Sequence, residues 1–406
     1  MSDYAGALAA YQEGRVLADR LAAEQPTDAV RFVLAQTYEG ISGVLVATGK
    51  PADALAAHGK VLAIVQELAD ANPANTEFQF LLVLTHDNSG HALRMTGQSA
   101  EALAAHGKAL AIARKLADAN PADTRFQMYI AGSHNNIGLV LSHLGKPAEA
   151  LAAQREALAI RQRLVDTHPA VTEFQNDLLW CHDQIGLLLL QTGKLAEALE
   201  AHGKALAILQ KLADANPANT KGELGLAPSH CYIGRVLARL QRFPEAFTAL
   251  DAGVALHRKL VESDPDNTSY RTGLACSLAY RGAARARAGQ PPLAAADLRR
   301  AVELWASGPS GDTVQALGWY SRFELSRALA LLAALDKTPK SGVTTAEAAA
   351  FADQSVAALA DAIKTGCALP AELKEPDFDA LRSRDDFKKL LAELEAKAGP
   401  KAKAKD

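Results

Sequence analysis

The stretch Gly49-Lys50-Pro51-Ala52-Asp53-Ala54-Leu55 recurs along most of this 406-residue chain and decides its architecture. Successive copies start 48 residues apart, at Gly97, Gly145 and Gly193, with weaker copies at Gln241 and Gly289. A fixed internal period of this size is typical of stacked structural repeats, in which each unit contacts only its neighbours. The period therefore predicts a repeat architecture, and it favours a binding function over catalysis.

Residues 172–217 show what one repeat contains. Apolar residues at helical spacing between Phe174 and Leu189 predict a first helix, which ends at Thr192-Gly193-Lys194. A second helical series runs from Ala198 to Leu212 and stops before a proline. Each helix has about 20 residues, so it is roughly 30 Å long, and the short turn makes the pair antiparallel. We therefore predict an all-α chain of helix-turn-helix repeats.

Small residues recur at two positions where the helices of a pair must touch. Seven residues before the turn stand the glycines Gly90, Gly138, Gly186, Gly234 and Gly282. Five residues after the turn stand the alanines Ala54, Ala102, Ala150, Ala198, Ala246 and Ala294. Because glycine inside a helix costs about 1 kcal/mol relative to alanine, its recurrence predicts a close approach of the two helices.

These residues carry a family resemblance. The combination of Gly186, Gly193, Ala198 and Ala205 resembles a tetratricopeptide repeat, and the long helices resemble the repeats of kinesin light chains, over about residues 4–306. The resemblance implies a right-handed α-solenoid, the tetratricopeptide superhelix. The linker at residues 71–78 and the ending from residue 376 resemble the repeat arms of large planctomycete serine/threonine kinases. This second resemblance implies an alternative function, as a regulatory or targeting arm derived from or acting with such a kinase.

The repeat register divides the chain into five parts. Residues 1–26 form an orphan N-terminal helix, 27–306 six repeats of about 48 residues, 307–366 a degenerate seventh helix pair, 367–398 a helical C-terminal cap, and 399–406 a disordered tail. Since the orphan helix matches second helices only, we expect that a preceding part of a larger parent was lost. Gly222, Gly225 and Pro228 predict that the first helix of the fifth repeat is kinked or starts late. Arg281 and Arg285 replace apolar residues in the sixth repeat, and such irregular places are where individual function is expected.

Histidines beside acidic residues suggest metal chemistry, but the repeat explains them. His86-Asp87 and His182-Asp183 occupy the same place as His134-Asn135 and His230-Cys231, so duplication accounts for all four. We predict packing or hydrogen-bonding roles for them, and for a second column formed by His58, His106 and His202. A metal ion shared by His182, His230 and Cys231 is disfavoured, because neighbouring helices lie about 8–10 Å apart. No metal, cofactor or catalytic residue is expected, since no phosphate-binding loop, hydrolase or kinase motif occurs.

The bulk composition limits the class of partner. A net charge of −3 gives no reason to expect nucleic acid or an anionic membrane as a partner. The first residues show no signal peptide, and no apolar run is long enough to span a bilayer. The cysteines Cys181, Cys231, Cys276 and Cys367 have no paired spacing, which favours a reducing compartment. We therefore expect a cytoplasmic protein.

The resemblance implies that the first helices line a concave groove. The groove residues it implies are an amide column of Asn88, Asn136 and Gln184 continued by Tyr232 and Tyr280, an adjacent column of Asp87, Asn135 and Asp183, and a basic end at Arg235, Arg239 and Arg287. Amides suit an extended peptide, and the arginines suit an acidic peptide or a free carboxylate. We thus expect a non-catalytic scaffold for a protein or peptide partner. Two alternatives stay open: these polar groups only face solvent or pair with neighbouring residues, and the orphan helix makes the chain a self-assembling homo-oligomer.

Overall fold

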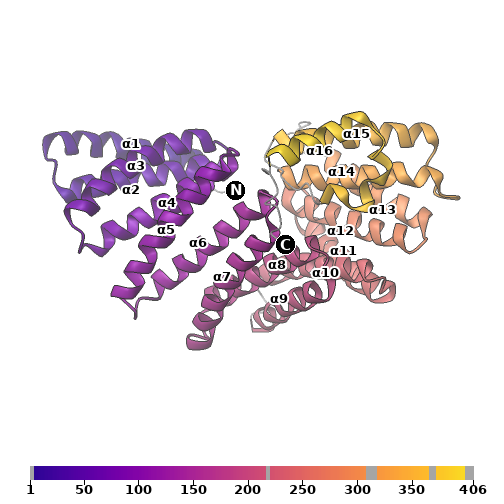
Figure 1. The fold of residues 1–406 in the computed structure, drawn as a ribbon, viewed down its shortest axis with the longest axis horizontal. Coiled ribbons are helices and arrows are strands. Elements are labelled where there is room, and N and C mark those ends of the chain that lie inside the picture. Colours follow the sequence, from indigo (N-terminus) through magenta and orange to yellow (C-terminus); the bar gives the residue numbers. More distant parts are fainter. Residues whose placement is uncertain (1–3, 216–219, 308–317, 365–371, 398–406) are drawn as a thin grey trace, which may run out of the picture. The chain divides into compact units, whose positions relative to one another are not determined.

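The computed structural model describes residues 4–215, 220–307, 318–364 and 372–397, and every regular element in these ranges is helical (Figure 1). Helix α1 is Tyr4–Glu24. The first helices of six pairs are α2 (Asp28–Ala47), α4 (Thr76–Met95), α6 (Thr124–His143), α8 (Thr172–Gln191), α10 (Thr220–Arg239) and α12 (Thr268–Arg287). The second helices are α3 (Pro51–Ala71), α5 (Ser99–Ala119), α7 (Pro147–Thr167), α9 (Leu195–Ala215), α11 (Phe243–Ser263) and α13 (Pro291–Ala306).

Further helices follow the six pairs, and three of those in the described ranges are short 3-10 helices. They are α14 (Trp319–Ala334), η1 (Leu335–Lys337), α15 (Thr345–Lys364), η2 (Glu372–Lys374), η3 (Pro376–Leu381) and α16 (Asp385–Lys397). The sequence predicts a helix from residue 313, and its first residues lie outside the described ranges, as does the predicted tail at 399–406. The predicted helix over residues 345–364 matches α15 at both ends.

The turn between the helices of a pair depends on one residue in the left-handed backbone conformation. Gly193 has φ +77°, and Lys194 N–H then donates to the Leu189 carbonyl at 2.9 Å, which closes the end of α8. Glycine adopts this conformation at little cost. In the fifth repeat the same place holds Gln241 with φ +59°, so that turn carries a conformational cost that the glycine turns avoid.

The start of α10 corrects one prediction. This helix begins at Thr220, 48 residues after Thr172 begins α8, and it continues through Pro228. The predicted late start is therefore wrong, since the helix keeps the register of the other repeats. Proline inside the helix only removes one backbone donor there.

The recurrent glycines make room for side chains of the second helices. A Cβ on Gly186 would lie 2.5 Å from Nε2 of His202, and a Cβ on Gly90 would lie 2.6 Å from Nε2 of His106. Leu250 fills the equivalent place against Gly234. The predicted close approach is present, and a side chain of the second helix lies directly over each of these glycines.

The chain divides into two compact units. The N-terminal unit comprises Met1–Leu141 and Ala152–Leu164, and the C-terminal unit comprises Ser142–Leu151 and Val165–Asp406. In the N-terminal unit one core joins α1 to α2, α3 and α4 around Leu34, Val61 and Leu81. In the C-terminal unit one core joins α14 and α15 to η3 and α16 around residues such as Phe323, Phe378 and Phe387. The segment from η2 to α16 is thus packed into the C-terminal unit.

Candidate interaction surfaces of the first helices

A buried carboxylate–imidazole pair joins the helices of the second repeat. Nδ1 of His106 on α5 lies 2.8 Å from Oδ1 of Asp87 on α4, and both residues are buried. Ser133 on α6 also donates to Asp87, at 3.2 and 3.3 Å from its two oxygens. Asp87 therefore has its hydrogen bonds within the protein, and we place it in the helix interface instead of on an open groove.

The same two positions pair in the other repeats. Asp183 Oδ1 and His202 Nδ1 are 2.8 Å apart, and Glu39 Oε2 and His58 Nδ1 are 3.5 Å apart. In the third repeat Gln154 Nε2 donates to the main-chain carbonyl of Asn135 at 3.2 Å. In repeats five and six the two positions hold Cys231 with Leu250 and Ala279 with Leu298. Polar residues therefore face polar ones and apolar residues face leucine, so Asn135 and Asp183 belong to this interface as well.

The histidines that recur on the first helices are also in surroundings that fit a structural role. Burial lowers the pKa of His86, His134 and His182, because a charged imidazole loses hydration there. His134 Nε2 lies 3.0 Å from a guanidinium nitrogen of Arg114. Among the described residues no group of three or more histidines, cysteines or acidic residues is placed to hold a metal ion.

The predicted amide column differs in exposure along the chain. Asn88 is exposed and donates to Glu39, while Asn136 and Gln184 are half-buried. Tyr232 stacks on His202 with ring centroids 5.2 Å apart. Tyr280 is buried, its hydroxyl lies 2.7 Å from that of Tyr320, and burial raises its pKa. The column is thus open to solvent in the N-terminal unit and closed at Tyr280.

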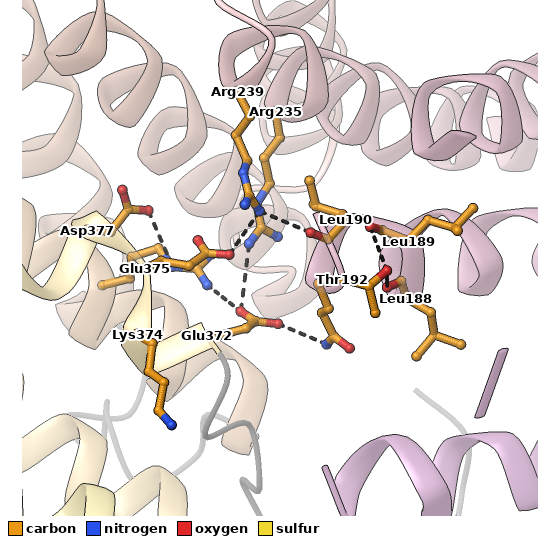
Figure 2. Close-up of polar contacts among 12 residues, drawn as sticks. Leu188, Leu189, Leu190, Thr192, Arg235, Arg239, Glu372, Lys374, Glu375 and Asp377 are labelled. Atoms are coloured by element: carbon orange, nitrogen blue, oxygen red, sulfur yellow. Dashed lines mark hydrogen bonds and ion pairs between the residues drawn. The ribbon is translucent and has the colours of Figure 1, made fainter. Parts of the chain in front are cut away.

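The predicted basic end is already bound to carboxylates of the chain itself. Figure 2 shows Arg235 and Arg239 directed toward the segment that carries Glu372 and Glu375. Arg239 Nη1 donates to Glu375 Oε1 at 2.9 Å and to the Leu190 carbonyl at 3.2 Å, and Arg287 donates to Asp377. Carboxylates do bind at this end, as its chemistry predicts, but they belong to the same chain, 136 positions after Arg239 and 90 positions after Arg287.

These contacts follow the repeat. Gln191 on α8, Arg239 on α10 and Arg287 on α12 each stand five residues after the recurrent glycine, and each bonds one acidic residue of 372–377. Gln191 Nε2 donates to Glu372 Oε1 at 3.0 Å. A short segment made of η2 and the start of η3 therefore crosses three first helices and meets the same position on each.

A second layer of charge lies beneath these contacts. Arg327 on α14 donates to Glu324 at 3.0 Å and to Glu372, and Arg235 lies 3.7 Å from Glu372. Burial alone would raise the pKa of Glu372, but Arg327 and Arg235 outweigh it and hold that pKa below its usual range. Burial raises the pKa of Glu324, against the opposite effect of the two arginines. Buried charges of this kind need their partners in place.

Apolar anchors hold the same segment. Phe378 and Leu381 of η3 are fully buried, and Phe378 lies 5.8 Å from Phe323 and 6.0 Å from Phe387 between ring centroids. Releasing the segment would expose these side chains, so it is an integral part of the C-terminal unit. The sequence predicts only a polar cap here; the spacing of Glu372, Glu375 and Asp377, together with the arginine column, is the signal that sequence reasoning missed.

Arg281 and Arg285 of the sixth repeat are both paired with Asp297 of the same repeat, and Arg281 also bonds Asp251 of the fifth repeat at 2.8 Å. Arg281 bonds Asp297 through two nitrogens at 2.8 and 2.9 Å, and Arg285 bonds the same carboxylate at 2.7 Å. Asp297 stands where the fifth repeat has Ala249, so the acidic and basic replacements match each other. We therefore interpret this irregularity as structural.

Nucleophile and imidazole pairs occur, but they are buried. His257 Nδ1 lies 2.7 Å from Ser277 Oγ, which lies 3.1 Å from Cys231 Sγ. Burial lowers the pKa of His257 to about 4, so it is a weak base. Ser277 is 1% exposed, which leaves no access for a substrate. No described helix is both long enough and apolar enough to cross a bilayer.

Comparison with known proteins agrees with this geometry. Residues 129–211 match the family model described as tetratricopeptide repeat, and no curated protein matches the chain. Many solved structures are similar to the chain, and three of them serve as examples. BtubC (BKLC) from P. vanneervenii is 19% identical over 64% of this chain and 93% of its own, with a TM-score of 0.50. The Rap conjugation gene regulator of plasmid pLS20, solved with the Phr* peptide, is 15% identical over 82% and 75%, with a TM-score of 0.50.

The third similar structure is the apo form of RapI, which is 11% identical over 98% of this chain and 94% of its own, with a TM-score of 0.57. At these identities the likeness shows the fold alone. The family match covers α7, α8 and most of α6 and α9, and the 48-residue period continues on both sides of it. Residues 129–211 therefore match tetratricopeptide repeats, and the helix pairs on either side keep the same period.

Proposed function

We propose that the chain is a non-catalytic scaffold that holds an extended segment of a protein partner on its first helices. One observation carries the proposal: Gln191, Arg239 and Arg287, at one position of three successive repeats, each bond one acidic residue of a single short segment. The chain thus contains an internal example in which the first helices of successive repeats hold a short acidic segment, η2 and the start of η3, with one contact per repeat. The solved Rap regulator with its Phr* peptide supports the idea that this fold can hold a peptide.

The partner segment would bind in the N-terminal unit. On α4 the position of Gln191 and Arg239 is taken by Met95, which is 38% exposed, and the position of Arg235 by His91. Asn88 is exposed one turn before His91, and Asn136 repeats it on α6. An amide can donate to and accept from a peptide backbone, and an exposed thioether adapts to apolar side chains. The expected ligand is therefore an extended segment with an apolar residue over Met95.

The test selects 12-residue peptides displayed on phage against the full chain and measures their affinity by fluorescence anisotropy. The variant Asn88→Ala/Met95→Ala/Asn136→Ala is expected to weaken binding at least about tenfold, a loss of about 1.4 kcal/mol. Glu101→Ala/Lys115→Ala, at exposed positions of the second helix α5, is the matched control and should bind as the unmodified chain does. Equal affinity of the triple variant would refute the groove assignment. Arg239 is unsuitable as a test position, because it is bonded to Glu375.

A further inference from the structure

One arginine of the N-terminal unit is half-buried without a carboxylate beside it. Arg94 stands near the end of α4, and its Nη2 lies 3.3 Å from Nδ1 of His91. Among the described residues no carboxylate lies within ion-pair distance of it. Burial lowers the pKa of Arg94 and no acidic group opposes this, whereas for Arg281 Asp297 and Asp251 outweigh burial and raise the pKa. Because arginines taken out of water are usually paired, Arg94 lacks a partner that its position calls for.

Polar groups on α2 and α4 leave the charge of Arg94 uncompensated. Burial, and next Arg94 itself, lower the pKa of His91, so this imidazole is neutral and only accepts a hydrogen bond from the guanidinium. Two carboxylates of these helices are already bonded, Glu39 to Asn88 and Asp87 to His106. The guanidinium therefore keeps its positive charge and its free donors.

The repeat indicates which side of the helix carries Arg94. The other repeats have a small or apolar residue at this position: Val46, Ser142, Leu190, Ala238 and Ala286. In the fifth repeat Ala238 lines a small cavity together with Arg235, Arg287 and Asp377. Since α4 is the equivalent of α10, Arg94 lies on the side of its helix that faces residues 372–377 in the C-terminal unit.

We propose that the partner segment carries an acidic side chain, aspartate or glutamate, that pairs with Arg94. This inference rests on the proposed function and adds the charge of the ligand to it. Arg239 and Arg287 of the first helices each bond a carboxylate from a short segment of the same chain. None of the described residues supplies such a carboxylate to Arg94, so a partner is its source. A half-buried guanidinium gains most from a charged acceptor, which makes the acidic residue a determinant of specificity.

The place of Arg94 in the sequence also predicts where the acidic residue stands in the partner. Arg94 and Met95 are adjacent, so their Cα atoms are about 3.8 Å apart. An extended peptide advances about 3.3 Å per residue. The acidic residue is therefore expected within about two positions of the apolar residue that contacts Met95.

The first experiment measures the preference for a carboxylate. The probes are the phage-selected 12-residue peptides, each also made with its acidic residue changed to the matching amide. The amide form is expected to bind the unmodified chain about tenfold more weakly, and the two forms should bind Arg94→Gln equally. Arg94→Lys keeps the charge and should keep part of the preference. Arg20→Gln, at an exposed position of α1, removes the same charge and is the matched control, which should keep all of it.

The outcomes separate this inference from the proposed function. Peptides that lose affinity for Asn88→Ala/Met95→Ala/Asn136→Ala, but bind equally in the acidic and the amide form, overturn the acidic ligand and leave the groove assignment in place. A library that yields no peptide sensitive to that triple variant overturns both. A preference for the acidic form that persists in Arg94→Gln also overturns the assignment to Arg94.

The second experiment reverses the charge. The selection is repeated on Arg94→Glu, and its peptides are expected to carry lysine or arginine where the first set carries aspartate or glutamate. A loss of folding could remove binding but could not produce this exchange of preference. An unchanged acidic preference in the peptides selected on Arg94→Glu overturns the proposal.

Discussion

Nδ1 of His106 lies 2.8 Å from Oδ1 of Asp87, and the same distance joins His202 to Asp183 two repeats later. In each case the carboxylate is on the first helix and the imidazole is on the second, 19 residues further on. Where the first helix carries Cys231 or Ala279, the second carries leucine. The two positions have therefore changed together, and the buried contact between them explains why.

The pair should be exchangeable between repeats. Asp87→Ala is expected to destabilise the chain by about 1–3 kcal/mol, because His106 and Ser133 lose a buried acceptor. Asp87→Ala/His106→Leu copies Ala279 and Leu298 of the sixth repeat, leaves no unpaired imidazole, and should recover part of that loss. Urea unfolding followed by circular dichroism measures both. A double variant no more stable than Asp87→Ala would show that the pair cannot be transferred.

Substitution of glycine by alanine should destabilise the chain at one position inside a helix and stabilise it at another. Gly186→Ala would bring a methyl group to within 2.5 Å of His202, so it is expected to lower the melting temperature. Gly203→Ala, on α9, meets nothing within 4 Å and should raise stability by up to about 1 kcal/mol through helix propensity. Thermal unfolding distinguishes the two. Equal changes at both positions would contradict the packing of His202 over Gly186.

Removing one buried carboxylate should weaken the C-terminal unit. Glu372→Ala takes an ion-pair partner from Arg327 and Arg235 in a buried site, at a cost of about 3 kcal/mol. Glu395→Ala breaks a pair with Lys374 that is about half exposed, and should change stability by less than about 1 kcal/mol. Limited proteolysis should then cut the Glu372→Ala variant faster within residues 372–397. Equal digestion rates of the two variants would argue against the ion cluster as an anchor.

Acid should destabilise the chain before its carboxylates titrate. The pKa of His257 falls from 6.5 in an unfolded chain to about 4 in the folded one, so the unfolded state takes up the proton first. Stability is therefore expected to fall as the pH drops from 6.5 toward 4, by up to about 3 kcal/mol from this residue. His86, His134 and His182 change in the same direction. In urea unfolding between pH 6.5 and 4.5, His257→Gln should show a shallower dependence than the unmodified chain; an unchanged slope would exclude His257 as a contributor.

The helices were predictable because their signals are local. Turn glycines, proline stops and apolar spacing lie within each 48-residue unit, and they give α8, α9 and α15 nearly at their observed ends. The predicted late start of α10 was wrong because Gly222, Gly225 and Pro228 each disfavour a helix locally, while the neighbouring repeats favour it. Packing between repeats outweighed local propensity.

The site was predictable only in part. The arginine column and its preference for a carboxylate follow from the sequence, but the source of the carboxylate does not. Arg287 and Asp377 are 90 residues apart, and Asp377 lies beyond the last regular repeat, where the period no longer indicates a neighbour. The inward position of Asp87 was readable from its joint variation with His106, a signal that appears only when two columns are compared.

The position of residues 372–397 in the sequence determines when, during synthesis, the ion pairs of the C-terminal unit can form. The helix pairs join residues close in sequence, so each can assemble soon after it leaves the ribosome. Arg235, Arg239 and Arg287 receive their acidic partners only after residues 372–377 have been synthesised. Until then the growing chain presents a row of arginines whose positive charge has no partner from this segment.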